Sequence, residues 1–194
     1  MGAIDSMFPA SATLREGTPI VIRRAAPRDA EGLACLDQEL VSEGLWTVRD
    51  PGGRVSLVEE LKRIASYSGA DRLLLVAVAG DGVVGEVAVK AHKAARCAHV
   101  ALLSITVAGA WRGRGVGRAL LGAACAWADA HPTIEKLELF VFAHNDRAVA
   151  LYTGAGFSLE GRRERYIRFG DGRYADDLVM GRFRGNRGGN PRNG

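Results

Sequence analysis

The chain has little cysteine and no long hydrophobic run. Its three cysteines, Cys35, Cys97 and Cys125, form no Cys-x-x-Cys pair, and its four histidines show no metal-ligand spacing. We therefore expect neither a disulfide framework nor a metal site. The richest apolar stretch, residues 73–79, has the length of a strand, far below the roughly 20 residues of a membrane-spanning helix. No basic segment followed by a hydrophobic one opens the chain, so we expect no secretory signal, a cytoplasmic location and no membrane partner.

Positive charge is concentrated near the C-terminus. The net charge is +4, and the last thirteen residues contain four arginines and no acid: Arg182, Arg184, Arg187 and Arg192. We expect a nearly neutral domain followed by a flexible basic tail of Gly, Asn and Arg at residues 185–194, because this composition cannot bury enough apolar surface to fold. The tail has no aromatic side chain on which bases could stack, so no nucleic-acid partner is expected.

Hydrophobic patterning predicts an α+β domain. The expected strands are at residues 19–24, 73–79, 83–90, 100–107 and 136–142, with two more around the Asp171-Gly172 turn. The expected helices are at residues 27–43, after a cap at Ser56 with Glu59, at 117–130 and at 145–155. Residues 1–17 are expected to be flexible. The order predicts one domain over residues 18–184, with helices on both faces of a mixed sheet.

The segment WRGRGVGRALL, residues 111–121, joins an expected strand to an expected helix. Its glycines allow positive φ and a close approach of the backbone to a ligand. The first N–H groups of the helix are unpaired at the positive end of its dipole, so the junction suits an anion such as a pyrophosphate. The spacing Gly-x-Gly-x-Gly is neither a Walker loop nor a first-turn Rossmann fingerprint. A tight strand–helix turn without a ligand is the alternative interpretation.

Two motifs resemble those of the GNAT superfamily of acetyl-CoA-dependent N-acetyltransferases. Arg112-x-x-Gly115-x-Gly117 resembles the acetyl-CoA signature, and NDRAVALYTGAGF at residues 145–157 resembles the second conserved block. The segment EGRRERYIRFGDGRYADDLVM is similar to the closing hairpin of members that act on small amines, including polyamines and amino acids. The resemblance covers residues 19–183. It implies a mostly antiparallel sheet that is splayed between the strands at 100–107 and 136–142, with helices on both faces.

The resemblance also implies a site for acetyl-CoA and no metal. The residues implied in binding are Ile105, Thr106, Val107, Arg112, Gly113, Arg114, Gly115, Val116, Gly117, Arg118, Asn145 and Tyr152. Tyr152 would in addition act as the general acid that protonates the leaving thiolate. Taken without the motif, Asn145 is a plain helix N-cap and Tyr152 a core aromatic, and both interpretations stay open.

The general base is not identified by the sequence. Many relatives read H-x-x-E-L-x-I-x-V on the central strand, whereas this chain reads HVALLSITV at residues 99–107 and has Leu102 at the acid's position. Glu86 and Glu43 are candidates, together with a water relay, and each can equally be a solvated surface acid. No Gly-x-Ser-x-Gly or Cys–His pattern is present, which favours direct attack by the amine without an acyl-enzyme.

We therefore expect an acyltransferase that moves an acetyl group from acetyl-CoA to the primary amine of a small molecule. An alternative is a protein acetyltransferase acting on an N-terminus, as in the ribosomal-protein type, or on lysine, which would need an open groove. A more distant alternative is a non-catalytic acyl-CoA-binding or RNA-binding module, against which an intact Tyr152 argues. The resemblance implies a homodimer, for which the sequence identifies no interface.

Overall fold

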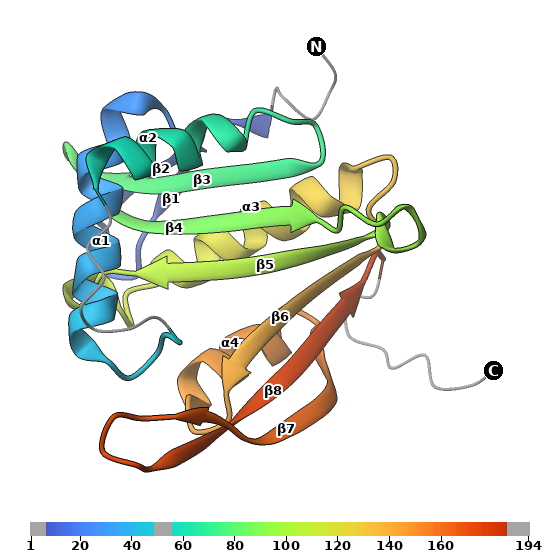
Figure 1. The fold of residues 1–194 in the computed structure, drawn as a ribbon. Coiled ribbons are helices and arrows are strands. Elements are labelled where there is room, and N and C mark those ends of the chain that lie inside the picture. Colours follow the sequence, from blue (N-terminus) through green and yellow to red (C-terminus); the bar gives the residue numbers. More distant parts are fainter. Residues whose placement is uncertain (1–6, 49–55, 186–194) are drawn as a thin grey trace.

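The computed structural model describes residues 7–48 and 56–185. Within these ranges eight strands form one sheet in the order β1-β2-β3-β4-β5-β6-β8-β7 (Figure 1). The strands are β1 (Ala10–Thr13), β2 (Pro19–Arg24), β3 (Arg72–Ala79), β4 (Gly82–Ala91), β5 (Val100–Val107), β6 (Lys136–Phe142), β7 (Ser158–Arg168) and β8 (Tyr174–Phe183). Every neighbouring pair is antiparallel except β5 and β6. The predicted α+β class is confirmed.

Four α-helices cover the sheet in the described part of the chain. They are α1 (Ala30–Glu43), α2 (Leu57–Ser66), α3 (Val116–Ala130) and α4 (Asp146–Gly154). Helices α1 and α2 lie on one face, and α3 and α4 lie on the other (Figure 1). Helix α2 begins at the predicted capping box, in which the Glu59 N–H donates to the Ser56 hydroxyl and the Ser56 N–H donates to the Glu59 carboxylate. No helix in the described ranges is long and apolar enough to span a bilayer.

The N-terminal segment differs from the prediction. Residues 10–13 form β1, which pairs along its whole length with β2, and the following Leu14 is 5% exposed within the main core. These residues therefore belong to the fold and not to a flexible arm. The segment Ala-Ser-Ala-Thr has only small side chains, so its strand conformation depends on pairing with β2 more than on its own pattern. Residues 1–6 of the expected arm lie outside the described ranges.

The C-terminal segment also carries less free positive charge than predicted, because two of its four arginines are bonded within the fold. Arg182 is 5% exposed and makes two hydrogen bonds, of 2.9 and 2.7 Å, to the Asp129 carboxylate on α3. Arg184 donates from Nη2 to the carbonyl oxygen of His131 at 2.6 Å. Both arginines bind residues 182–184 to the fold, because their guanidinium groups donate hydrogen bonds to acceptors in it. Arg187, Arg192 and the rest of residues 186–194 lie outside the described ranges.

Strands β5 and β6 are neighbours only at their first residues. Val100, Ala101 and Leu102 pair in parallel with the first three residues of β6, and beyond them the two strands diverge (Figure 1). On its other edge β5 stays paired with β4 as far as Val107. Residues 103–107 of β5 therefore have one edge without a neighbouring strand, where backbone N–H and C=O groups need other partners. The predicted splay is confirmed.

Candidate active site

The glycine-rich loop lies where β5 ends and α3 begins. Gly113 has φ +82° and Gly115, the N-cap of α3, has φ +110°, which glycine adopts far more readily than any residue with a side chain. The next three N–H groups, of Val116, Gly117 and Arg118, have no carbonyl one turn earlier within the helix. The loop thus presents unpaired donors at the positive end of a 15-residue helix, as an anion site requires.

Helix α1 holds the start of this loop in place. The Gly109 N–H donates to the Glu39 carboxylate at 2.7 Å, and Arg112 Nη1 pairs with the Glu43 carboxylate at 2.8 Å. Arg112 Nε also donates to the carbonyl oxygen of Val107 at 2.9 Å. The guanidinium of Arg112 therefore joins the loop to β5 and α1. Glu43, one of the two predicted candidates for the base, is paired with this arginine at the loop.

The other arginines at the loop differ in how much of their charge is free. Arg114 pairs with Glu16 at 2.5 Å. Arg118 has no hydrogen bond or ion pair within the described part of the chain, and the same holds for Arg147 on the first turn of α4. A Cβ atom on Gly113 would lie 3.2 Å from Arg147 Nη2, so this guanidinium lies directly against the loop. Sequence reasoning missed Arg147, because only the fold places the first turn of α4 against Gly113.

Asn145 and Tyr152 lie on the same side as the loop, at α4. The Asn145 side chain accepts the Ala148 N–H at 3.1 Å, which is N-cap geometry. Tyr152 is 8% exposed, and its ring centroid lies 5.9 Å from that of Phe157. Burial raises the pKa of the Tyr152 phenol to about 12, and no side chain or carbonyl in the described ranges bonds to its oxygen. The phenol therefore keeps its proton at neutral pH and can donate it.

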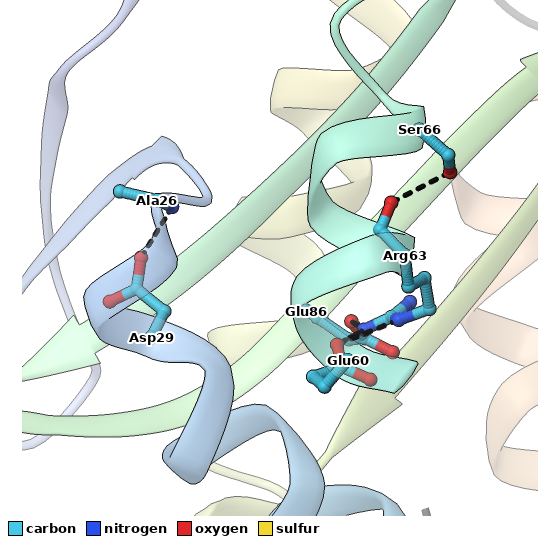
Figure 2. A network of polar contacts seen from close by, with 6 residues as sticks. All are labelled: Ala26, Asp29, Glu60, Arg63, Ser66 and Glu86. Atoms are coloured by element: carbon cyan, nitrogen blue, oxygen red, sulfur yellow. Dashed lines mark hydrogen bonds and ion pairs between the residues drawn. The ribbon is translucent and has the colours of Figure 1, made fainter. Parts of the chain in front are cut away.

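Glu86 belongs to a buried charge network between β4 and α2. Its carboxylate pairs with Arg63 at 2.5 Å, and Arg63 also pairs with Glu60 at 2.7 Å (Figure 2). Burial raises the pKa of Glu86; Arg63 acts against this shift, while the charges of Glu60 and Asp37 add to it. Two carboxylates share one guanidinium, so the network carries a net negative charge when both are ionised. Glu86, the second predicted candidate for the base, is thus partly buried and paired with Arg63.

Within the described ranges, no element covers part of the sheet face beside α1 and α2. Ser104 on β5 is the cross-strand partner of Ala88, which packs against α1 and α2, so the two side chains project from the same face. On this face Ser104 is exposed, Leu102 is 38% exposed and Phe140 on β6 is 44% exposed. These side chains form an open surface along the diverging strands, on the face opposite to α3 and α4. A second reactant can approach the edge of β5 from this side.

Comparison with known proteins agrees with these features. Residues 42–157, which contain the loop and the Asn145 block, match the model of the acetyltransferase (GNAT) family. The chain is 30% identical over 165 residues to the L-amino acid N-acetyltransferase AaaT of Escherichia coli, covering 85% of this chain and 98% of that protein.

Solved structures agree as well. A GNAT acetyltransferase from Streptococcus pneumoniae is 29% identical with a TM-score of 0.80, over 84% of this chain and 99% of that one. A phosphinothricin acetyltransferase from Sinorhizobium meliloti, solved with acetyl-CoA, shares the fold at a TM-score of 0.78 and 23% identity, over 86% of this chain and 89% of that one. The chain therefore belongs to the acetyltransferase (GNAT) family and is an acetyl-CoA-dependent N-acetyltransferase.

Proposed function

We propose that this enzyme acetylates the primary amine of a small molecule by direct attack, and that amino acids are its substrate class. The observation that carries the proposal is the free edge of β5 at residues 103–107, which leads directly into the loop of unpaired N–H groups. An extended acyl carrier with a phosphate at one end fits this pair of features. The amino-acid class is supported by AaaT, which is named an L-amino acid N-acetyltransferase and is matched over 98% of its length.

The residues of the loop and edge fit acetyl-CoA. The N–H groups at the start of α3 would hold the pyrophosphate, and the guanidinium groups of Arg118 and Arg147 would add the positive charge that is free at this end. Backbone groups of Ile105, Thr106 and Val107 would pair with the two pantetheine amides, as an added strand does. Arg112 would act mainly by positioning the loop, because its Nε and Nη1 groups already donate to Val107 and Glu43.

The arrangement supports transfer without an acyl-enzyme. The thiol of Cys125 on α3 is 8% exposed, and burial raises its pKa to about 11, so it is a protonated and inaccessible nucleophile at neutral pH. Tyr152 would supply the proton for the leaving thiolate, since it is protonated and without a competing hydrogen-bond acceptor in the described ranges. The amine would attack from the uncovered face of β5 and β6.

A second candidate substrate is the N-terminus of a peptide. The surface formed by Leu102, Ser104 and Phe140 is open, with 38% and 44% of Leu102 and Phe140 exposed. A peptide could lie along such a surface, whereas an enclosed pocket would admit only a small amine. Because this surface is open, short peptides are included among the substrates to be assayed.

The experiment is a panel of amines assayed by release of free coenzyme A thiol. The panel contains L-amino acids, polyamines and short peptides with free N-termini, and mass spectrometry of the product locates the acetyl group. We expect turnover with amino acids and none with Gly115→Asp, which serves as the blank. Turnover with peptides alone would favour the second candidate, and no turnover with any amine would contradict the proposed function.

A further inference from the structure

Glu138 on β6 lies beside Leu102, the position at which relatives carry an acid. The two are Cα partners in the last parallel pair before the strands diverge. The preceding pair, Ala101 and Leu137, is 0% and 1% exposed within the core on the α3 side. Because side chains alternate along a strand, Leu102 and Glu138 both project from the opposite face. Adjacent strands are about 4.8 Å apart, so a carboxylate at position 138 lies about one strand spacing from the place where relatives carry theirs, at position 102.

We propose that Glu138 is the general base of this enzyme, in place of the acid that Leu102 replaces. The inference rests on the proposed function, because it depends on where the thioester of acetyl-CoA lies. From its phosphate to its sulfur, the carrier arm has the length of about four extended residues. Measured back from Val107, beside the loop, four residues along the free edge end at Leu103. The reacting carbon would then lie near Leu103, one residue from the Leu102–Glu138 pair at which the two strands begin to diverge.

The carboxylate of Glu138 is free enough to accept a proton. Its side chain is 21% exposed, and its ion pair within the described ranges is a long one, 3.4 Å, with Lys136. Lys136 makes its shorter ion pair, 2.6 Å, with Glu160. The neighbour of Glu138 on β8 is Gly181, over which the side chains of Glu160 and Lys136 lie. Glu138 is therefore partly accessible from this face, and the cation beside it, Lys136, lies closer to Glu160 than to Glu138.

The other two acids are placed less well for this role. Glu86 is the cross-strand partner of Thr106, which is about 13 Å along β5 from Leu102. Its carboxylate has Arg63 at 2.5 Å. Glu43 lies with Arg112 at the phosphate end of the edge. Both acids are thus at the wrong end of the edge and are held by arginines.

The proposed step conserves atoms and charge. The amine arrives as an ammonium ion and loses one proton to the Glu138 carboxylate, directly or through one water. The freed lone pair forms the N–C bond at the thioester carbonyl carbon, and a second N–H proton passes to solvent as the amide forms. The C–S bond then breaks with its electron pair on sulfur, which takes a proton from the Tyr152 phenol. The products are the acetylated amine and free coenzyme A thiol, and proton exchange with solvent returns Glu138 and Tyr152 to their starting forms.

The test is Glu138→Gln, with kcat measured by coenzyme A release and acetyl-CoA affinity measured by calorimetry. We expect kcat at pH 7 to fall by on the order of 10²–10⁴-fold, with affinity unchanged. The loss should shrink as the pH approaches the pKa of the substrate amine, because the amine then arrives deprotonated. Glu164→Gln is the matched control, since it removes an exposed carboxylate on β7 that has no ion pair within the described ranges, and it should keep wild-type kcat.

A second-site variant separates catalysis from structure. Leu102→Glu in the Glu138→Gln background places a carboxylate one strand away on the same face and should restore at least about tenfold of the lost kcat. Glu138→Asp, which keeps the charge with a shorter reach, should give an intermediate kcat and the wild-type pH profile. A Glu138→Gln enzyme with more than a tenth of wild-type kcat at pH 7, or an equal loss in Glu164→Gln, would overturn the inference. An inactive wild type would instead contradict the proposed function.

Discussion

Tyr152→Phe tests the proposed general acid, which protonates the leaving thiolate. The substitution keeps the buried ring, which lies 5.9 Å from that of Phe157, and removes only the phenol oxygen. That oxygen has no protein hydrogen bond within the described ranges, so we expect the free energy of unfolding to change by less than about 1 kcal/mol. Tyr152→Ala would remove the ring as well and should cost about 3–5 kcal/mol. The Phe variant therefore isolates the proton donor from the packing.

The kinetic expectation for Tyr152→Phe follows from general acid catalysis. We expect kcat to fall by on the order of 10²–10⁴-fold, while the Kd of acetyl-CoA stays unchanged. Because burial raises the phenol pKa to about 12, from an ordinary value of about 10, the wild type should keep its proton donor to about pH 11. Ionisation of the phenol should accordingly leave the free energy of unfolding unchanged below about pH 10. The free energy of unfolding should then fall as the pH rises from about 10 through 12.

The assay compares kcat, the calorimetric Kd and the midpoint of thermal unfolding for the wild type, Tyr152→Phe and Tyr174→Phe. Tyr174 is 45% exposed on β8 and is the matched control, because it loses the same atom away from the edge of β5. A fall in kcat of less than about tenfold would refute the role of Tyr152 as general acid. An equal fall in the control would refute it too.

Three further predictions concern the cofactor loop and the fold. Gly115→Asp should abolish acetyl-CoA binding in calorimetry, because it puts a side chain at φ +110° and a negative charge at the start of α3; an unchanged Kd would remove the cofactor assignment. Arg147→Ala should raise the Kd by about tenfold, with a smaller effect at high salt. Asp29 is 4% exposed and pairs with Arg23 at 2.6 Å (its bond to the Ala26 N–H is in Figure 2). Burial acts to raise the pKa of Asp29, but these bonds outweigh it and lower the pKa. Asp29→Asn should therefore reduce the free energy of unfolding by about 3 kcal/mol at pH 7. The difference in stability between wild type and variant should narrow below about pH 4, which thermal unfolding at pH 7 and pH 3 would show.

Features that depend on sequence neighbours could be predicted from the sequence. The Ser56–Glu59 capping box involves two residues three positions apart, and the positive φ of Gly115 belongs to a turn and a helix start encoded by one short segment. The strand β1 could not be predicted in the same way, since its partner decides its conformation. Leu14, directly after β1, is buried in the main core, which the pattern of residues 10–13 does not indicate.

The charged residues of the site also divide into those that the sequence predicts and those that depend on tertiary partners. The sequence indicates that arginines surround the loop, but their partners come from distant elements: Arg112 pairs with Glu43, 69 residues earlier. An arginine that looks like a phosphate ligand is therefore used to position the loop. Arg147, which the motif does not single out, has a free guanidinium within the described ranges and lies against Gly113. Which cation is available depends on tertiary pairing, and residue type alone cannot show it.

The base illustrates the strongest limit on sequence reasoning. The sequence shows that position 102 lacks an acid, and the candidates taken from the sequence are Glu86 and Glu43. The neighbour that matters is set by the register of β5 and β6, which pairs Leu102 with Glu138 across 36 positions of chain. A slip of one residue in this register would turn Glu138 toward the buried side. Because paired positions on adjacent strands share a face and are about 4.8 Å apart, a carboxylate can move from one strand to the next and still reach the same reacting atoms. Where an acid is missing from β5 in this fold, the paired position on β6 is therefore the first place to look for its replacement.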